Sequence, residues 1–164
     1  MRRNAGRGNL PAMLTFALES PLNPDLALLM ERHHADMHAD TPPGSNHMLD
    51  PKGLTAPSIR FFVLREDGRP IGMGALKRLD PSHAEIKSMH ILAEERGRGL
   101  ARLMLDHLLA EAAADGIAQV SLETGAQPSF AAARGLYERG GFAVCPPFGS
   151  YAEDPNSTFM TRML

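Results

Sequence analysis

Apolar residues in the middle of the chain gather in three runs typical of strands, namely Ile59–Leu64, Ile71–Leu79 and His83–Leu92. The first run is short and apolar, the second is interrupted by Gly72 and Gly74, and Asp67-Gly68 between them reads as a hairpin turn. The third run alternates regularly, so two sets of its residues are predicted to lie on opposite faces of a sheet. One set is Glu85, Lys87, Met89 and Ile91, and the other is Ile86, Ser88, His90 and Leu92.

The segment before these runs predicts one further strand and two helices. Met13–Leu18 is the strand. A helix is expected to begin with Asn23 as its N-cap and Pro24 at its first position, and to end before Thr41. A short helix at about His47–Leu54 is expected to lie over the substrate pocket.

The segment after these runs alternates helices with strands. A central helix is predicted from Arg98 or Gly99 to about Asp115, where Gly116 stops it. A strand containing Val120 and Leu122, a helix from Pro128 or Ser129 to Gly140-Gly141, and strands at Phe142–Cys145 and Ser157–Met163 complete the chain. This order predicts an α+β fold, in which a mixed sheet carries helices on both faces.

Composition limits the classes of protein to which the chain belongs. The 164 residues, 43% hydrophobic and 22% charged, fit one domain over 10–164, after a disordered tail at 1–9. A net charge of -2 without a run of like charges argues against a nucleic-acid partner, and no apolar run is long enough for a membrane span. The single cysteine, Cys145, excludes an internal disulfide, and a cytoplasmic location is predicted.

One turn has the composition of an anion site. It reads Arg96-Gly97-Arg98-Gly99-Leu100-Ala101 and leads from a strand into the central helix. Glycines let backbone N–H groups approach a ligand, the helix N-terminus adds its dipole, and Arg96, Arg98 and Arg102 add positive charge, so a diphosphate is the expected ligand. A solvated strand-to-helix turn is the alternative, because a dinucleotide fingerprint would need a third glycine where Arg102 stands.

The same turn resembles the GNAT acyltransferases. In that family the pattern Gln/Arg-x-x-Gly-x-Gly/Ala holds the pyrophosphate of acetyl-CoA, and here Arg96, Gly99 and Ala101 fill it. A second block, Ala133 to Phe142, is similar to the family's Ala-x-x-Leu-Tyr-x-x-x-Gly-Phe. The sequences at 85–89 and 153–157 resemble those of the YsnE-like branch of the family.

The resemblance implies a fold and a cofactor site. The central sheet is then mostly antiparallel, with a splay between its fourth and fifth strands that admits the pantetheine arm of acetyl-CoA. Phe130 departs from the family, because many relatives carry an asparagine there that contacts this arm. The implied cofactor-binding residues are Met89, His90, Ile91, Arg96, Gly97, Arg98, Gly99, Leu100, Ala101, Phe130 and Ala133.

Acyl transfer to an amine needs a base and a proton donor. The resemblance assigns the base to Glu85, whose alternative role is an ion pair with Lys87, and the donor to Tyr137, whose alternative role is packing under the sheet. Backbone N–H groups around Ile91 are expected to stabilise the oxyanion. Cys145 has no histidine close in sequence and is expected to be a small buried side chain, so direct attack in a ternary complex is predicted.

The acceptor is expected to contact the parts of the chain least similar to the family, which are His33–Leu54 and the loop Phe148–Asn156. Glu153 and Asp154 are candidates for binding a cationic amine, and His34, His38 and His47 for binding a carboxylate or phosphonate. Turn-forming and solvated roles are the alternatives. His34 and His38 stand one helical turn apart, a spacing that also suits a metal, but a polar helix face is favoured and no metal is predicted.

Three functions remain open. The leading hypothesis is an acetyl-CoA-dependent N-acetyltransferase that acts on the primary amine of a small molecule. The second is a protein or peptide N-acetyltransferase, and the third is a regulatory module that binds acyl-CoA without turnover. A homodimer is compatible with each of them.

Overall fold

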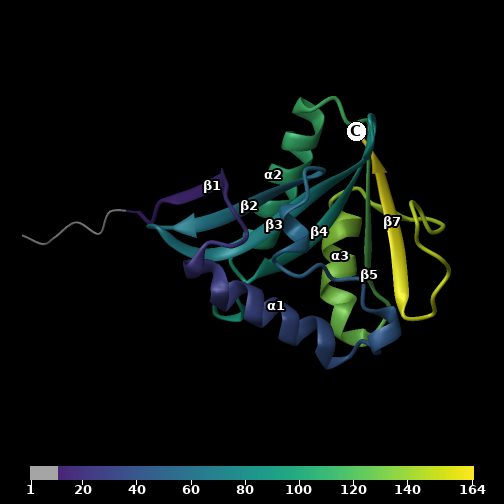
Figure 1. Ribbon diagram of the computed structural model, residues 1–164, viewed down its shortest axis with the longest axis horizontal. Coiled ribbons are helices and arrows are strands. Elements are labelled where there is room, and N and C mark those ends of the chain that lie inside the picture. The colour runs from purple at the N-terminus through teal and green to yellow at the C-terminus, as the bar shows by residue number, and fades with distance from the viewer. Residues whose placement is uncertain (1–10) are drawn as a thin grey trace, which may run out of the picture.

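The computed structural model describes residues 11–164, so the tail predicted at 1–9 lies outside the described residues. Seven strands and three α-helices occur within this range (Figure 1). The strands are β1 Leu14–Leu18, β2 Ile59–Glu66, β3 Arg69–Asp80, β4 His83–Ile91, β5 Gln119–Gly125, β6 Ala143–Val144 and β7 Ser157–Met163. The helices are α1 Ala27–Ala39, α2 Leu100–Ala114 and α3 Ala131–Arg139. No helix in the described range is long and apolar enough to cross a membrane.

The strands form one mixed sheet in the order β1-β2-β3-β4-β5-β7-β6. Every neighbouring pair is antiparallel except β4 and β5, which run parallel and are connected through α2. This arrangement confirms the predicted α+β fold with a mostly antiparallel sheet.

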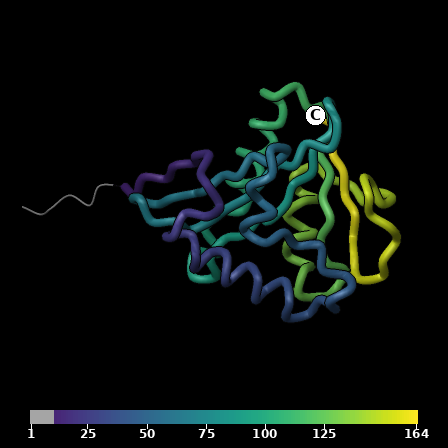
Figure 2. The backbone as a smooth tube through the Cα atoms, viewed as in Figure 1, coloured from purple at the N-terminus to yellow at the C-terminus, as the bar shows by residue number. Residues whose placement is uncertain are grey.

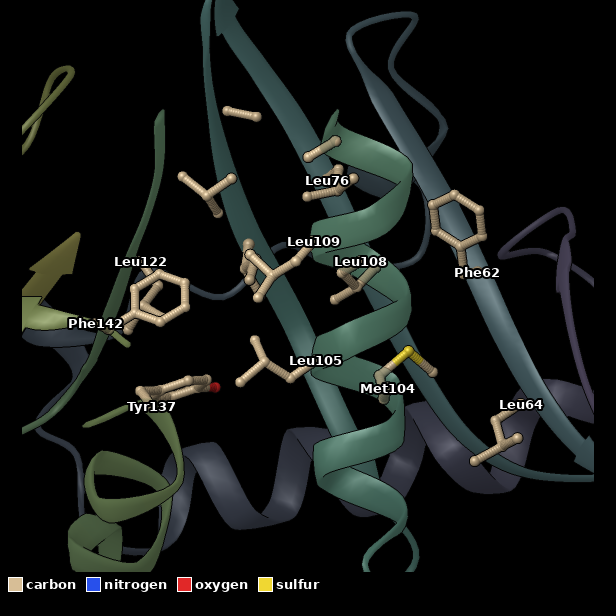
Figure 3. Close-up of a cluster of buried hydrophobic side chains, with 14 of the residues drawn as sticks. Phe62, Leu64, Leu76, Met104, Leu105, Leu108, Leu109, Leu122, Tyr137 and Phe142 are labelled. Carbon is tan, nitrogen blue, oxygen red and sulfur yellow. The ribbon is translucent and has the colours of Figure 1, made fainter. Parts of the chain in front are cut away.

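Helices cover both faces of the sheet, and each face has its own hydrophobic core. On one face α2 buries Met104, Leu105 and Leu108 completely, and Tyr137 of α3 joins the same cluster (Figure 3). On the other face the cluster contains Leu26 and Leu29, which lie at the start of α1 and just before it. Helices α2 and α3 therefore lie on the opposite side of the sheet from α1.

The pairing between β4 and β5 stops halfway along both strands. His83 to Ile86 pair with Gln119 to Leu122, and no later residue of β4 has a partner in β5. β4 nevertheless continues to Ile91 and β5 to Gly125. The two strands therefore splay apart beyond Ile86, as the resemblance to the GNAT family implied.

A bulge in β4 lies at the start of the splay. Lys87 pairs with Ala75 of β3 and His90 pairs with Met73, so two residues of β4, Ser88 and Met89, oppose one residue of β3. Ser88 has a left-handed backbone with φ of +54°, which is unusual for a residue other than glycine.

The bulge overturns the predicted alternation along β4. Ile91 packs with Ile86 in the α2 cluster, whereas Leu92 packs in the α1 cluster. Ile91 therefore does not share the face of Glu85, and His90 does, because one extra residue reverses the alternation beyond Ser88.

Three other elements differ from the predictions. The helix expected at His47–Leu54 is absent from the described structure, where only short 3-10 turns occur at Pro43–Ser45 and Gly53–Thr55. α2 begins at Leu100 because Gly99, at φ of +76°, serves as its left-handed N-cap. The strand predicted at Phe142–Cys145 is reduced to the two residues of β6.

The left-handed backbone at Ser88 gives the first prediction. Ser88→Gly should raise the free energy of unfolding by about 1 kcal/mol, because glycine adopts positive φ without steric conflict. The substitution also removes a buried hydroxyl that has no hydrogen-bond partner in the described structure. Urea unfolding followed by circular dichroism measures the change.

Ser88→Val is the matched control. A β-branched side chain tolerates positive φ poorly, so this variant should lose roughly 1–3 kcal/mol. Equal stabilities for the glycine and valine variants would contradict a strained backbone at this position.

Candidate active site

A cavity of about 710 Å³ lies where β4 and β5 separate, between the N-terminus of α2 and the start of α3. We call it the groove. Ten of the eleven residues predicted to bind the cofactor line it, and only Arg98 does not. The ten are Met89, His90, Ile91, Arg96, Gly97, Gly99, Leu100, Ala101, Phe130 and Ala133. Its volume is within the range of small-molecule and cofactor pockets.

The turn before α2 lines the groove with two left-handed glycines. Gly97 and Gly99 have φ of +81° and +76°, and a Cβ at either position would meet no atom within 4 Å. Glycine is therefore required by the backbone conformation and not by lack of space. Left-handed glycines next to a helix N-terminus form the kind of concavity that binds phosphate.

Three arginines line the groove, but they are not the three predicted. Arg96, Arg102 and Arg139 lie at the groove, whereas the Arg98 side chain turns away and pairs with Glu66 and with Glu95 at 2.5 Å. The expected charge of Arg98 near the ligand is therefore neutralised by carboxylates. The prediction was wrong for this side chain because sequence spacing does not show on which side of a turn a long side chain lies.

Arg96 fixes the end of β4. Its Nε donates to the carbonyl oxygen of Ile91 at 3.1 Å, and its guanidinium pairs with Asp36 of α1 at 3.0 Å. The N–H of Leu92 donates to Ile71 of β3 at 3.0 Å. Since N–H directions alternate along a strand, the N–H of Ile91 points away from β3 and toward the splay. It can hydrogen-bond a thioester carbonyl there.

A second, smaller cavity of about 120 Å³ adjoins the groove. We call it the acceptor cavity. The two share six residues, namely His33, Met37, Met89, Phe130, Ala133 and Tyr137. The polar side chains of the acceptor cavity also include Glu85, Lys87, Glu123, His47 and Tyr151. A molecule in the acceptor cavity and one in the groove would therefore meet at a common wall.

Glu85 lies in the acceptor cavity within a triangle of polar groups. Its side chain accepts a hydrogen bond from the Tyr151 hydroxyl at 2.5 Å and one from Lys87 Nζ at 3.2 Å. Lys87 Nζ also donates to the Tyr151 oxygen at 2.9 Å. Glu85 is only 3% exposed, so its charge is balanced by Lys87 inside the protein.

Sequence reasoning missed Tyr151 and Glu123. Tyr151 comes from the loop Phe148–Asn156, which was predicted to contact the acceptor, but the residue itself was not singled out. Glu123 belongs to β5 and makes no ion pair with any residue in the described range. Burial raises the pKa of its carboxyl above the ordinary value, and the nearby charge of Glu85 acts in the same direction.

Tyr137 lies at the wall common to the two cavities. It is 8% exposed and packs against Phe142, with the ring centroids 5.9 Å apart (Figure 3). Burial, and to a smaller extent the charge of Glu123, raises the pKa of Tyr137 to about 12. The hydroxyl therefore stays protonated at neutral pH, and the residue both packs in the core and borders the site.

Two of the three histidines predicted to bind the acceptor lie on the exposed face of α1. His34 and His38 are exposed, stack on each other at 4.0 Å and line neither cavity. His33 instead lines both cavities and packs edge-on against His90 at 5.2 Å. The weak amphipathicity of α1 concealed which face is buried. His47 does line the acceptor cavity, as predicted.

Burial determines the charge of the two inner histidines. It lowers the pKa of His33 to about 4, with a further contribution from His90, and it lowers the pKa of His90 to about 4. Both imidazoles are therefore neutral at pH 7. No group of three or more potential metal ligands occurs in the described range.

Glu153 and Asp154 also lie outside both cavities. Glu153 is exposed, and Asp154 accepts the N–H of Asn156 at 2.8 Å in a turn. Asn156 of the same loop donates through Nδ2 to Ser45 Oγ at 3.1 Å, which joins the segment after α1 to the residue before β7 (Figure 2). Neither carboxylate lies where the predicted contact with an amine needs it, because Asp154 serves the turn and Glu153 is exposed.

Cys145 lies outside both cavities. Its thiol is partly exposed, and burial raises its pKa. A raised pKa makes the thiolate scarce, so nothing about this thiol suits it to carry an acyl group.

Comparisons with known proteins agree with this geometry. A family model described as "Acetyltransferase (GNAT) family" matches residues 26–142. The uncharacterized N-acetyltransferase YsnE of Bacillus subtilis is 45% identical over 136 residues, covering 83% of this chain and 90% of that protein. The uncharacterized N-acetyltransferase YedL of Escherichia coli is 38% identical over 152 residues, covering 93% of this chain and 96% of that protein.

A solved structure is similar over nearly the whole fold. The PaiA N-acetyltransferase of Thermoplasma acidophilum, solved in complex with coenzyme A, superposes with a TM-score of 0.74 at 15% identity. The match covers 93% of this chain and 99% of that one.

The turn before α2 gives the second prediction. Ala101 lies in the first turn of α2 and lines the groove, so Ala101→Glu would place a negative charge beside a bound diphosphate. The affinity for coenzyme A should fall roughly tenfold or more, whereas a carboxylate in a first helical turn favours the helix itself. Isothermal titration calorimetry measures the affinity.

Ala101→Gln separates charge from size. It adds the same bulk without the charge and should retain most of the affinity. Similar affinities for the glutamate and glutamine variants would contradict diphosphate binding at this turn.

Proposed function

The chain belongs to the acetyltransferase (GNAT) family, and we propose that it transfers an acetyl group from acetyl-CoA to the primary amine of a small molecule. The observation that carries this proposal is the junction of the two cavities at Tyr137. The groove has the residues that hold a nucleotide diphosphate. The acceptor cavity is small and carries carboxylates, which suit a cationic amine.

The groove fits acetyl-CoA as a co-substrate. Its left-handed glycines and Ala101 leave room for phosphate oxygens at the N-terminus of α2. Arg96, Arg102 and Arg139 supply positive charge. We assign the pantetheine contact at the other end to the apolar side chains of Phe130 and Ala133.

The transfer needs a proton to leave the ammonium and one to reach the departing thiolate. In our proposal a carboxylate of the acceptor cavity, Glu85 directly or through water, takes the proton from the ammonium. The amine lone pair then forms the new bond to the thioester carbon, and the N–H of Ile91 stabilises the oxyanion. When the C–S bond breaks, Tyr137 gives its proton to the thiolate, and the resulting phenolate takes the second proton of the new amide nitrogen, directly or through water. The tyrosine is thereby restored, and no acyl-enzyme forms.

A turnover assay distinguishes the proposed function from the two alternatives, a protein or peptide N-acetyltransferase and a regulatory module that binds acyl-CoA. Release of free thiol from acetyl-CoA, measured with a panel of small amines and of peptides, tests all three hypotheses at once. Small amines should be the best acceptors, because the acceptor cavity of about 120 Å³ has room for only a few non-hydrogen atoms. Turnover restricted to peptides would favour a protein acetyltransferase. No turnover despite binding of acetyl-CoA would favour the regulatory module. A cytoplasmic location and a homodimer stay predictions.

Tyr137→Phe tests the proton donor. The variant removes one hydroxyl and little volume, so kcat should fall roughly ten- to a thousandfold while the affinity for acetyl-CoA stays almost unchanged. Steady-state kinetics and calorimetry give the two values. Turnover at the wild-type rate would show that water protonates the thiolate.

Glu85→Gln tests the base. The substitution keeps the shape and removes the basicity, so kcat/KM should fall most at low pH, by roughly a hundredfold. Raising the pH should partly restore it, because the neutral amine increases about tenfold per pH unit below the amine's pKa. Equal losses at every pH would show that Glu85 serves its ion pair with Lys87.

A further inference from the structure

Two carboxylates face the acceptor cavity, and their surroundings are opposite. Glu85 is matched by Lys87 and by the Tyr151 hydroxyl. Glu123 makes no ion pair in the described range. Burial raises the pKa of its carboxyl, and the smaller opposing effects of the Ser157 hydroxyl and of the charges of His47 and Lys87 do not outweigh it. A charge that burial makes unfavourable, and that the fold leaves unmatched, is available for a ligand of opposite charge.

Glu123 lies where an acceptor would enter the reaction zone. Leu122 is the last residue of β5 that pairs with β4, so Glu123 is the first one beyond the pairing, at the start of the splay. Ser121 pairs with Glu85, and alternation along β5 puts Glu123 on the same face as Ser121. Its side chain lines the acceptor cavity, as does Tyr137, which also lines the groove.

The charges of the cavity add up to one uncompensated negative charge. Glu85 and Lys87 cancel, neutral His33 adds nothing, and Glu123 remains as the carboxylate without an ion pair, with the His47 ring as the other titratable imidazole on this wall. A simple alkylammonium ion brings the total to zero. An α-amino acid brings no net charge, and its carboxylate would have to enter beside two glutamates.

From this arrangement we propose that Glu123 binds the ammonium group of the acceptor and selects cationic amines that carry no carboxylate on the same carbon. The inference rests on the proposed function and names the acceptor class of that site. Glu123 is a binding residue here, and the proton still leaves as described for Glu85. This binding forms and breaks no covalent bond, so it needs no further reactant.

Binding of the cation should depend on pH. The titratable groups that line the acceptor cavity with Glu123 are His33 of α1, His47 of the loop before β2, Glu85 and Lys87 of β4, Tyr137 of α3, and Tyr151 of the loop before β7. Burial raises the pKa of Glu123, so the carboxylate charges only above its usual range. The affinity for an ammonium ion should therefore increase as the pH rises through that pKa.

The same shift predicts an unusual effect on stability. A carboxyl whose pKa is raised by folding destabilises the native state at every pH where it is ionised. Glu123→Gln removes that charge, so at pH 8 without amine its Tm should equal or exceed that of the wild type. Glu85→Gln, the same substitution across the cavity, leaves Lys87 with a weaker partner and should lower Tm.

The selectivity test uses ethylamine, alaninamide and alanine with acetyl-CoA in wild type and in Glu123→Gln. Alaninamide is a cation of nearly the size of alanine, and each acceptor is compared with itself in the two proteins, which cancels differences in amine basicity. KM should rise roughly ten- to a hundredfold for ethylamine and alaninamide in the variant and by less than about threefold for alanine. An equal change for all three, or none, overturns the proposal.

A binding measurement without turnover keeps this proposal separate from the proposed function. Ethylammonium chloride should raise the Tm of the wild type at pH 8 more than sodium chloride at the same ionic strength, and should not do so for Glu123→Gln. This result would support the site even if no thiol were released in any assay. A lower Tm for Glu123→Gln without amine, together with the same ethylammonium response in both proteins, would show a structural role and overturn it.

Discussion

The early end of the pairing between β4 and β5 is the constraint on which the rest of the site depends. A parallel pair normally satisfies its backbone groups along its whole length, but here the ladder stops at Ile86 and Leu122. The bulge at Ser88 and Met89 then re-aims the remainder of β4. Both cavities lie at the opening that results. The left-handed backbone of Ser88 is thus a local cost that the fold tolerates in order to expose backbone N–H groups at a reaction site.

The sequence was sufficient for features that depend on neighbours in the chain. The turn from Arg96 to Ala101 requires its glycines for backbone reasons, so its motif predicted its geometry. It was insufficient where one extra residue changes a face, as at Ile91, because strand alternation contains no sign of a bulge. The three-dimensional setting of α1 decided that His33 and not His34 faces the site. Tyr151 reaches Glu85 across 66 residues, and local patterns do not record such a contact.

The surface of the cofactor turn shows how charge is distributed around the site. The charge of Arg98 is balanced by Glu66 and Glu95. Hydrogen bonds from Arg69 and, second, from Arg98 lower the pKa of Glu95. The Arg98 guanidinium therefore fixes the outside of the turn. The inner side keeps Arg96 at the groove. Both arginines of the turn pair with carboxylates of the chain, Arg98 on the outside and Arg96 with Asp36, but only Arg96 also lines the groove.

Helix α1 touches both cavities, through His33 and Met37, and it also holds Arg96 through Asp36. Two ligands that contact one rigid element cannot bind independently when either of them displaces it. Linkage then requires that the factor by which the first ligand changes the affinity of the second equals the factor in the opposite direction. A ligand in the groove that displaced α1 would therefore change the affinity of the acceptor cavity, and substitutions on the outer surface of α1 would alter this coupling without contacting either cavity.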